Sequence, residues 1–192
     1  MRAVPAADAG QRVAYQGEPG AFSEEAALGM LGPGIRLAPH ADFAGVFRAL
    51  RTGACDAIVV PVENSLAGRV EAVQWERARN PALRCDGELT LPIELHLLGL
   101  TADPQAFAAV RTVWSHPVAL AQCRKFIARH GRMQFEAGHD TAGSVRLVMA
   151  AGDPRRAAIA GRRAALRYGA AILCEHIEDR ADNRTRFLLL RR

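Results

Sequence analysis

The C-terminal stretch DNRTRFLLL, residues 182–190, joins polar residues that could do chemistry to an apolar run that could hold them in place. In an extended segment, Asn183, Thr185 and Phe187 point to one side and the two arginines point to the other. Residues 188–190 are apolar on both faces, which predicts a buried terminal strand. A threonine hydroxyl held by a rigid strand is well placed to donate a proton. Because it is a very weak acid, it can catalyse only a reaction whose leaving group departs with a strong driving force of its own.

A second polar group follows an apolar run in VVPVENSLAG, residues 59–68. The run suits a strand buried on both faces, and it delivers Glu63, Asn64 and Ser65 to the mouth of that strand. There they could meet a ligand, although Asn and Ser capping the next helix explains them equally well. The glycine-containing turn in QGEPGAFSEEAA, residues 16–27, could hold a carboxylate or phosphate, or be an ordinary strand–helix turn. It matches neither nucleotide-binding glycine motif, so nucleotide binding has no support.

Two further loops place polar residues before helices. In WSHPVALAQC, Ser115 and His116 precede a helix, and Gln122 lies two turns on, where it would return to nearly the same face. A Ser–His hydrolase is disfavoured because adjacent residues do not easily form a nucleophile–base pair and no G-x-S-x-G motif exists. His116 is instead interpreted as a capping or structural histidine. In HDTAGSVRL, Thr141 at a helix start could bind an anion or act as a simple N-cap.

Composition limits the classes of function. The 192 residues carry a net charge of +5 and a pI near 9.6. Only Lys125 among the 25 basic residues is a lysine, which is typical of genome composition. Acidic residues are interspersed and aromatic residues are few, so we expect a small anionic ligand rather than nucleic acid. The four cysteines show no metal-ligand or disulfide spacing, so we expect free thiols and no metal site.

No apolar stretch approaches the length of a membrane span, and residues 1–10 read as a flexible leader without a secretory signal. We therefore expect no membrane association and a cytoplasmic location.

Strand and helix patterns alternate along the chain, which predicts an α/β fold with mostly parallel sheets. The elements are too many for one small sheet, so we expect two small α/β lobes with a central cleft. We place lobe 1 at 11–90, completed by a returning C-terminal strand in 177–192, and lobe 2 at 91–176. The expected elements include a first strand at 12–17, a helix capped by Ser23, a helix capped by Asp42, one strand over 91–100, one helix from His116 to His130, and a helix from Asp140.

Five motifs, in order, resemble those of prephenate dehydratases: YQGEPGAFSEEAA, VVPVENSLAG, SHPVALAQC, DTAGS and DNRTRFLLL. The resemblance implies two α/β lobes similar to type II periplasmic binding proteins, with the site in the cleft. It implies conversion of prephenate, a dicarboxylate, to phenylpyruvate, carbon dioxide and water in phenylalanine biosynthesis, with no cofactor and as a homodimer. It also assigns catalytic positions to Thr185 as proton donor, to Asn64 and to Gln122. Positions expected to bind substrate are Ala21, Glu63, Ser65, Ser115, Thr141, Arg186 and Phe187.

The sequence departs from the family pattern in three places. Ala21 stands where many members have Thr or Ser, and arogenate dehydratases are among the relatives with alanine, so arogenate is an alternative substrate. The sequence ends directly after the T-R-F motif, without the usual C-terminal ACT domain, and no chorismate mutase domain precedes the fold. We therefore expect an enzyme that phenylalanine does not inhibit in cis. Residues 70–89 match the family weakly.

Two other functions fit the same fold. Prephenate decarboxylases resemble this family but lose the T-R-F motif, which is intact here at 185–187. A non-catalytic small-molecule binding module is the remaining alternative, although no export signal or DNA-binding helix pair accompanies it.

Overall fold

The computed structural model describes residues 10–103 and 105–192, which form two compact units. The first holds the described residues up to Glu18, together with Phe22–Pro92 and Asn183–Arg192, and the second holds Pro19–Ala21 and Ile93–Asp182. The predicted lobe boundaries lay at 90/91 and 176/177. The assignment of residues 19–21 to the second unit had no counterpart in the sequence prediction, and the predicted leader lies almost wholly outside the described residues.

The first unit is built around a mixed sheet in the strand order β2-β1-β3-β11-β5, with β4 beside β3. Its elements are β1 (Arg12–Gln16), α1 (Phe22–Leu31), β2 (Arg36–His40), α2 (Phe43–Thr52), β3 (Ala57–Asn64), β4 (Gly68–Arg69), α3 (Glu71–Arg79), β5 (Arg84–Pro92) and β11 (Arg184–Arg191). Strand β1 is parallel to β2 and β3, whereas β11 is antiparallel to both β3 and β5.

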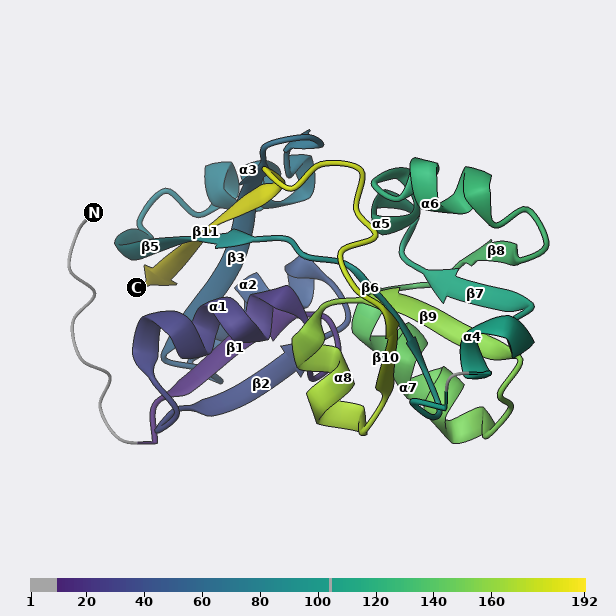
Figure 1. The fold of residues 1–192 in the computed structure, drawn as a ribbon. Helices are drawn as coiled ribbons and strands as arrows, with labels where there is room; N and C mark the ends of the chain where they lie inside the picture. The colour runs from purple at the N-terminus through teal and green to yellow at the C-terminus, as the bar shows by residue number, and fades with distance from the viewer. Residues whose placement is uncertain (1–9, 104) are drawn as a thin grey trace. The chain divides into compact units, whose positions relative to one another are not determined.

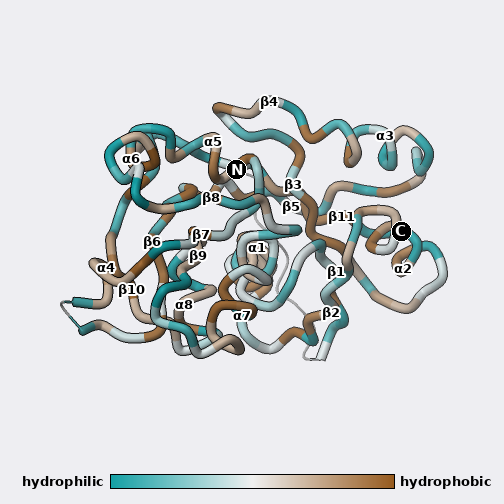
Figure 2. The backbone as a smooth tube through the Cα atoms, turned by 90° about the vertical axis from the view of Figure 1, so that its right-hand side faces the viewer, coloured by the Kyte–Doolittle hydropathy of each residue, from teal (hydrophilic) through white to brown (hydrophobic). Residues whose placement is uncertain are grey.

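Helices cover both faces of this sheet because its central strands are apolar on both sides. Residues of α1 pack with Val59, Phe187 and Leu189 on one face, and residues of α2 and α3 pack with Val60 and Leu188 on the other. In Figure 2 the hydrophobic colour accordingly runs along the central strands. The last strand is thus buried between two neighbours, as the apolar run at 188–190 predicted.

The start of α2 follows the predicted capping chemistry. The Asp42 carboxylate accepts from Gly45 N at 2.7 Å, and Gly53 ends the helix in the left-handed conformation at φ 77°. Ser23 does not cap α1 as predicted, because the helix already begins at Phe22 and Ser23 lies buried inside its first turn.

The second unit is built around a sheet in the strand order β10-β6-β9-β7-β8. Its elements are β6 (His96–Gly99), α4 (Ala106–Ala109), β7 (Thr112–Ser115), α5 (Pro117–Ala121), α6 (Arg124–Arg129), β8 (Gln134–Ala137), α7 (Thr141–Ala151), β9 (Arg156–Ala160), α8 (Arg162–Tyr168) and β10 (Ala171–Cys174). Strand β7 is parallel to β8 and β9, whereas β6 is antiparallel to β9 and β10. Helices α7 and α8 pack on one face.

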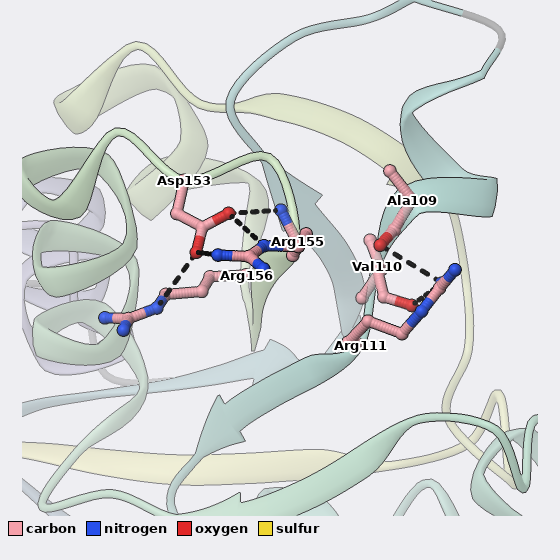
Figure 3. A network of polar contacts seen from close by, with 6 residues as sticks. All are labelled: Ala109, Val110, Arg111, Asp153, Arg155 and Arg156. Carbon is pink, nitrogen blue, oxygen red and sulfur yellow. Dashed lines mark hydrogen bonds and ion pairs between the residues drawn. The ribbon is translucent and has the colours of Figure 1, made fainter.

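The turn between α7 and β9 is held by charge-assisted hydrogen bonds, shown in Figure 3. Arg155 donates to the Asp153 carboxylate through its backbone N, Nε and Nη2, at 2.9–3.1 Å, and Arg156 Nε lies 3.6 Å away from the same group. These bonds lower the pKa of Asp153. In the same view, Arg111 Nη1 donates to the carbonyls of Ala109 and Val110 at the end of α4.

Three expectations about these elements are wrong. The sheets are not mostly parallel, because β5, β6, β10 and β11 all run against a neighbour. The apolar run 91–100 is not one strand: β5 ends at Pro92 and β6 begins at His96, in different units. The helix expected from His116 to His130 is two helices, α5 and α6, separated by a break at Gln122–Cys123.

In the part of the chain that the structure describes, no helix has the length and apolar character of a membrane span.

Candidate functional site

The first group of candidate residues lies where β3 ends and β11 begins. These strands are neighbours in the sheet (Figure 1). Their register pairs Asn64 with Thr185. The two residues are 121 positions apart in the sequence. The antiparallel return of the chain end therefore brings two predicted catalytic residues into direct contact.

Asn64 orients this group through both ends of its side chain. Its Oδ1 accepts from the backbone N of Leu66 at 3.0 Å and of Ala67 at 2.8 Å. Its Nδ2 therefore points the other way, where it donates to Thr185 Oγ1 at 2.9 Å and to Asn183 Oδ1 at 2.8 Å. The two backbone donors settle which end of the amide faces Thr185.

The Thr185 side chain is 8% exposed, so its hydroxyl is held in a largely dry environment. Since its oxygen accepts from Asn64, its own hydrogen is directed elsewhere. Beside it, Ser65 fixes the backbone of Arg184: Ser65 N donates to Arg184 O at 2.9 Å, and Arg184 N donates to Ser65 Oγ at 3.0 Å. The start of β11 is thus locked to the loop after β3.

Arg186, Glu63 and Phe187 are the other predicted residues close to Thr185 in this sheet. Arg186 pairs with Glu63 at 3.2 Å and with Glu88 at 3.6 Å, and all three side chains are about half exposed. Phe187 is 2% exposed and packs in the core against α1, so it anchors the strand to that helix. Arg184 is exposed.

The second group of candidates lies at the carboxyl end of β7 in the second unit. The Ser115 hydroxyl is completely buried and donates to Ile159 O of β9 at 2.6 Å, while its carbonyl accepts from Gly138 N at 2.7 Å. His116 caps α5 by accepting from Val118 N at 3.2 Å through Nδ1, and burial lowers its pKa. The interpretation of His116 as a capping residue is confirmed. Ser115 donates a hydrogen bond to a backbone carbonyl and not to a histidine base.

Gln122 and Thr141 each lie at a helix end in this unit. Gln122 ends α5, and its carbonyl accepts from Asp179 N at 2.7 Å. The break after it creates a new helix start, where the Asp179 carboxylate accepts from the backbone N of Arg124 and Lys125 at 3.0 and 2.8 Å. Thr141 is the first residue of α7, and the cap itself is Asp140, whose side chain accepts from Gly143 N. Thr141 is half-buried and is not used as the cap.

Ala21 and Gly20 belong to the second unit, although α1 begins at the next residue. Ala21 packs against the apolar cluster that contains Ala142, Ala160 and Ala164. Gly20 has φ +94°, and a Cβ at this position would come within 2.9 Å of Ala164 Cα. Only glycine fits this approach, which gives a physical reason for the glycine in the turn.

Neither metal nor thiol chemistry has a built site in the part of the chain that is described. Over 10–103 and 105–192 no group of three or more His, Cys, Asp and Glu residues is placed to hold a metal ion. Burial raises the pKa of the Cys123 thiol to about 12, and it also raises the pKa of Cys55. A groove of about 640 Å³ between α2 and α3, lined by Phe43 and the exposed Trp75, contains none of the predicted site residues.

The sequence comparison decides the family. The model of the family described as prephenate dehydratase matches residues 13–192. The chain belongs to the prephenate dehydratase family.

Relatives of known structure or name agree with this assignment. An arogenate dehydratase of Petunia hybrida is 40% identical over 182 residues, and a bifunctional chorismate mutase/prephenate dehydratase of Stutzerimonas stutzeri is 38% identical over 183 residues. These alignments cover 94% and 93% of this chain but 42% and 48% of the relatives. The chain therefore spans less than half the length of these curated relatives.

Among solved structures, a prephenate dehydratase from Arthrobacter aurescens in complex with L-Phe has a TM-score of 0.84 and 29% identity. That match covers 94% of this chain and 60% of the neighbour. A protein described as a novel type of quorum quenching acylase has a TM-score of 0.81 and 34% identity, covering 95% and 64%. The α/β fold predicted from the sequence is confirmed.

Asn183 is a further candidate residue, which the sequence prediction did not include. It lies two positions before Thr185 on the same face of the strand, and it contacts Asn64 directly. The alternation rule that placed Thr185 had already put Asn183 on that face.

Proposed function

We propose that this chain catalyses the decarboxylating dehydration of prephenate to phenylpyruvate, carbon dioxide and water. The observation that supports this most is the hydrogen bond from Asn64 Nδ2 to Thr185 Oγ1, 2.9 Å long. It makes the Thr185 oxygen an acceptor, so that its O–H hydrogen remains for a substrate oxygen. An acid as weak as threonine suits this reaction because the aromatic ring that forms supplies most of the driving force.

In the proposed reaction the bond between the ring and its carboxylate breaks, and carbon dioxide departs. The bonding electrons pass into the ring, the C–O bond on the opposite side breaks, and the ring becomes aromatic. The departing oxygen takes the Thr185 proton and leaves as water, and solvent restores that proton. Positioned proton transfer of this kind typically contributes about 10²–10⁴-fold to the rate.

The other residues have proposed supporting roles. Asn64 orients Thr185, and Ser65 holds the backbone beside it. Phe187 acts as an anchor of the strand, which replaces the substrate contact expected for it, and Glu63 with Arg186 forms a charged pair beside the site. In the second unit, Gln122 and Thr141 lie at helix ends and keep their expected roles in this proposal, while the Ser115 carbonyl accepts from Gly138 N and holds that loop. Ala21 serves as packing in this proposal.

Three further properties belong to the proposal. The reaction requires no cofactor, because proton donation and loss of carbon dioxide need no external electron acceptor. A cytoplasmic location and a homodimer rest on the resemblance to the family. Light scattering of the purified chain tests the dimer, which a monomer at micromolar concentration would contradict.

Arogenate is the second candidate substrate. The arogenate dehydratase of Petunia hybrida is 40% identical to this chain, and Ala21 matches the residue that the sequence resemblance associates with such enzymes. Arogenate would give phenylalanine by the same bond changes, so Thr185 and Asn64 would keep their roles.

An acylase activity finds little support in the local geometry. The Ser115 hydroxyl is completely buried and donates to Ile159 O, while the His116 ring accepts from the backbone of its own helix. The Cys123 thiol has a pKa of about 12. Neither the Ser115 hydroxyl nor the Cys123 thiol is therefore activated as a nucleophile.

Product identification tests the proposal. The purified chain is incubated separately with prephenate and with arogenate, and the products are identified by chromatography and mass spectrometry. We expect phenylpyruvate from prephenate, whereas phenylalanine from arogenate alone would support the second candidate. A product that retains the ring hydroxyl, or no turnover of either substrate, would contradict the proposal.

A further inference from the structure

Asn183 carries a buried hydrogen-bond donor that none of the described residues accepts from. The residue is 1% exposed, and its Oδ1 accepts from Asn64 Nδ2 at 2.8 Å. Its Nδ2 has no hydrogen-bond partner among the described residues. A buried amide nitrogen without an acceptor destabilises a fold, so such groups are rare and call for an explanation.

The orientation of this amide follows from its neighbours. The backbone N–H groups of Leu66 and Ala67 fix Asn64 Oδ1, and they thereby direct Asn64 Nδ2 at Asn183. Asn183 must present its oxygen to that donor. Turning the Asn183 amide over would set two N–H groups against each other. Its nitrogen must therefore point to the side where no described residue accepts a hydrogen bond from it.

Two donors are thus held side by side at the start of β11. Asn183 Oδ1 and Thr185 Oγ1 both contact Asn64 Nδ2, at 2.8 and 2.9 Å, so the two oxygens lie at most 5.7 Å apart. Both side chains point to the same face of the strand and both are more than nine-tenths buried. The Thr185 O–H and the Asn183 N–H are therefore neighbouring donors whose acceptors the described residues do not supply.

We propose that Asn183 Nδ2 donates a hydrogen bond to the substrate oxygen that leaves, beside the Thr185 hydroxyl that protonates it. This inference rests on the proposed dehydratase function. As the C–O bond lengthens, negative charge gathers on the oxygen before proton transfer is complete. A fixed N–H donor in a dry environment interacts more strongly with that charge than with the neutral hydroxyl. Asn183 is then a catalytic residue that acts mainly in the transition state, and no electron or proton beyond the dehydration itself is required.

The test uses Asn183→Asp, which keeps the shape and the oxygen facing Asn64 but replaces the donor by an acceptor. We expect kcat for prephenate to fall about 10²-fold, the magnitude typical of losing one such donor, with KM changed less than about threefold. Two control variants are measured with Asn183→Asp. Arg184→Ala removes the exposed neighbour between Asn183 and Thr185, and Asn80→Asp makes the same chemical change at an amide that donates to Glu76 O on α3. Both should keep kcat within about twofold.

A second comparison separates direct contact from action through Thr185. In a Thr185→Ala background, Asn183→Asp should still lower the residual turnover, measured at high enzyme concentration. No further loss there would mean that Asn183 only positions Thr185, which would overturn the proposal. A rise in KM alone, or parallel losses of turnover and of melting temperature, would overturn it as well. Failure of the wild-type chain to convert prephenate would instead refute the proposed function.

Discussion

Replacement of Asn64 by aspartate tests the orientation of the proton donor. The introduced carboxylate would keep one oxygen for the backbone N–H groups of Leu66 and Ala67, but its other oxygen would face Thr185 Oγ1 where a donor stood. The Thr185 hydroxyl would then turn and donate to that carboxylate. Its proton would no longer be available to the substrate.

The expected magnitudes separate catalysis from stability. Asn64 has two N–H groups, and each net hydrogen bond contributes about 0.5–1.5 kcal/mol, so the loss is about 1–3 kcal/mol. For a chain of this size that corresponds to a melting temperature lower by roughly 2–12 °C. Loss of positioned proton donation should lower kcat by about 10²–10⁴-fold, which unfolding on this scale does not explain at 25 °C.

The assay follows phenylpyruvate formation from prephenate between pH 4.5 and 8, with thermal melts of the same samples. Activity of Asn64→Asp should recover in part at low pH, because the introduced carboxyl group, once protonated, can again donate to Thr185. Asn80→Asp serves as the control and should show neither the loss nor the recovery. The reasoning would be refuted if Asn64→Asp kept more than a tenth of the wild-type kcat, or if its residual activity did not rise on acidification.

Three further predictions concern stability and reactivity. Burial, followed by the charge of Arg162, lowers the pKa of His96 below its ordinary 6.5, so the unfolded chain takes up the proton more readily. The free energy of unfolding should therefore decrease as pH falls below about 6.5, and urea melts of His96→Gln should show a shallower decrease; an unchanged slope would contradict this. Gly20→Ala places a Cβ 2.9 Å from Ala164 Cα at a residue with φ +94°. It should lower the free energy of unfolding by about 1–3 kcal/mol, and the melting temperature by roughly 2–12 °C. An unchanged melting temperature would show that the turn relaxes without strain. Burial raises the pKa of Cys123 to about 12, so iodoacetamide should modify the exposed Cys85 in the native protein and Cys123 only after unfolding; mass spectrometry that found the reverse order would contradict the described burial.

The elements whose signals are local could be predicted from the sequence. Alternation along 183–187 placed Thr185 on the side opposite the two arginines, and the apolar run behind it predicted the buried strand that β3 and β5 enclose. Asp42 marked the start of α2 because capping acts over three or four residues.

Features that depend on distant partners could not be predicted from local patterns. The run 91–100 contains the end of β5 and all of β6, and hydrophobicity alone could not reveal the change of sheet after Pro92. The break at Gln122–Cys123 carries no glycine or proline. It is stabilised by Asp179, more than 50 positions away, which caps the second helix.

The candidate site likewise combines features that local patterns predict with features that depend on distant partners. Asn64 and Thr185 were named through the motifs of the family, but their hydrogen bond joins residues 121 positions apart and follows only from the antiparallel pairing of β3 and β11. Asn183 was visible in the alternation pattern, yet its proposed role depends on a nitrogen that has no partner among the described residues, which only the folded chain shows.

The most direct test of the account is the turnover of prephenate by Thr185 variants that melt like the wild type. Thr185→Ser keeps the hydroxyl that Asn64 contacts and should retain part of kcat, whereas Thr185→Ala should lose about 10²–10⁴-fold. Full turnover by Thr185→Ala, with phenylpyruvate still the product, would contradict the assignment of Thr185 as the proton donor.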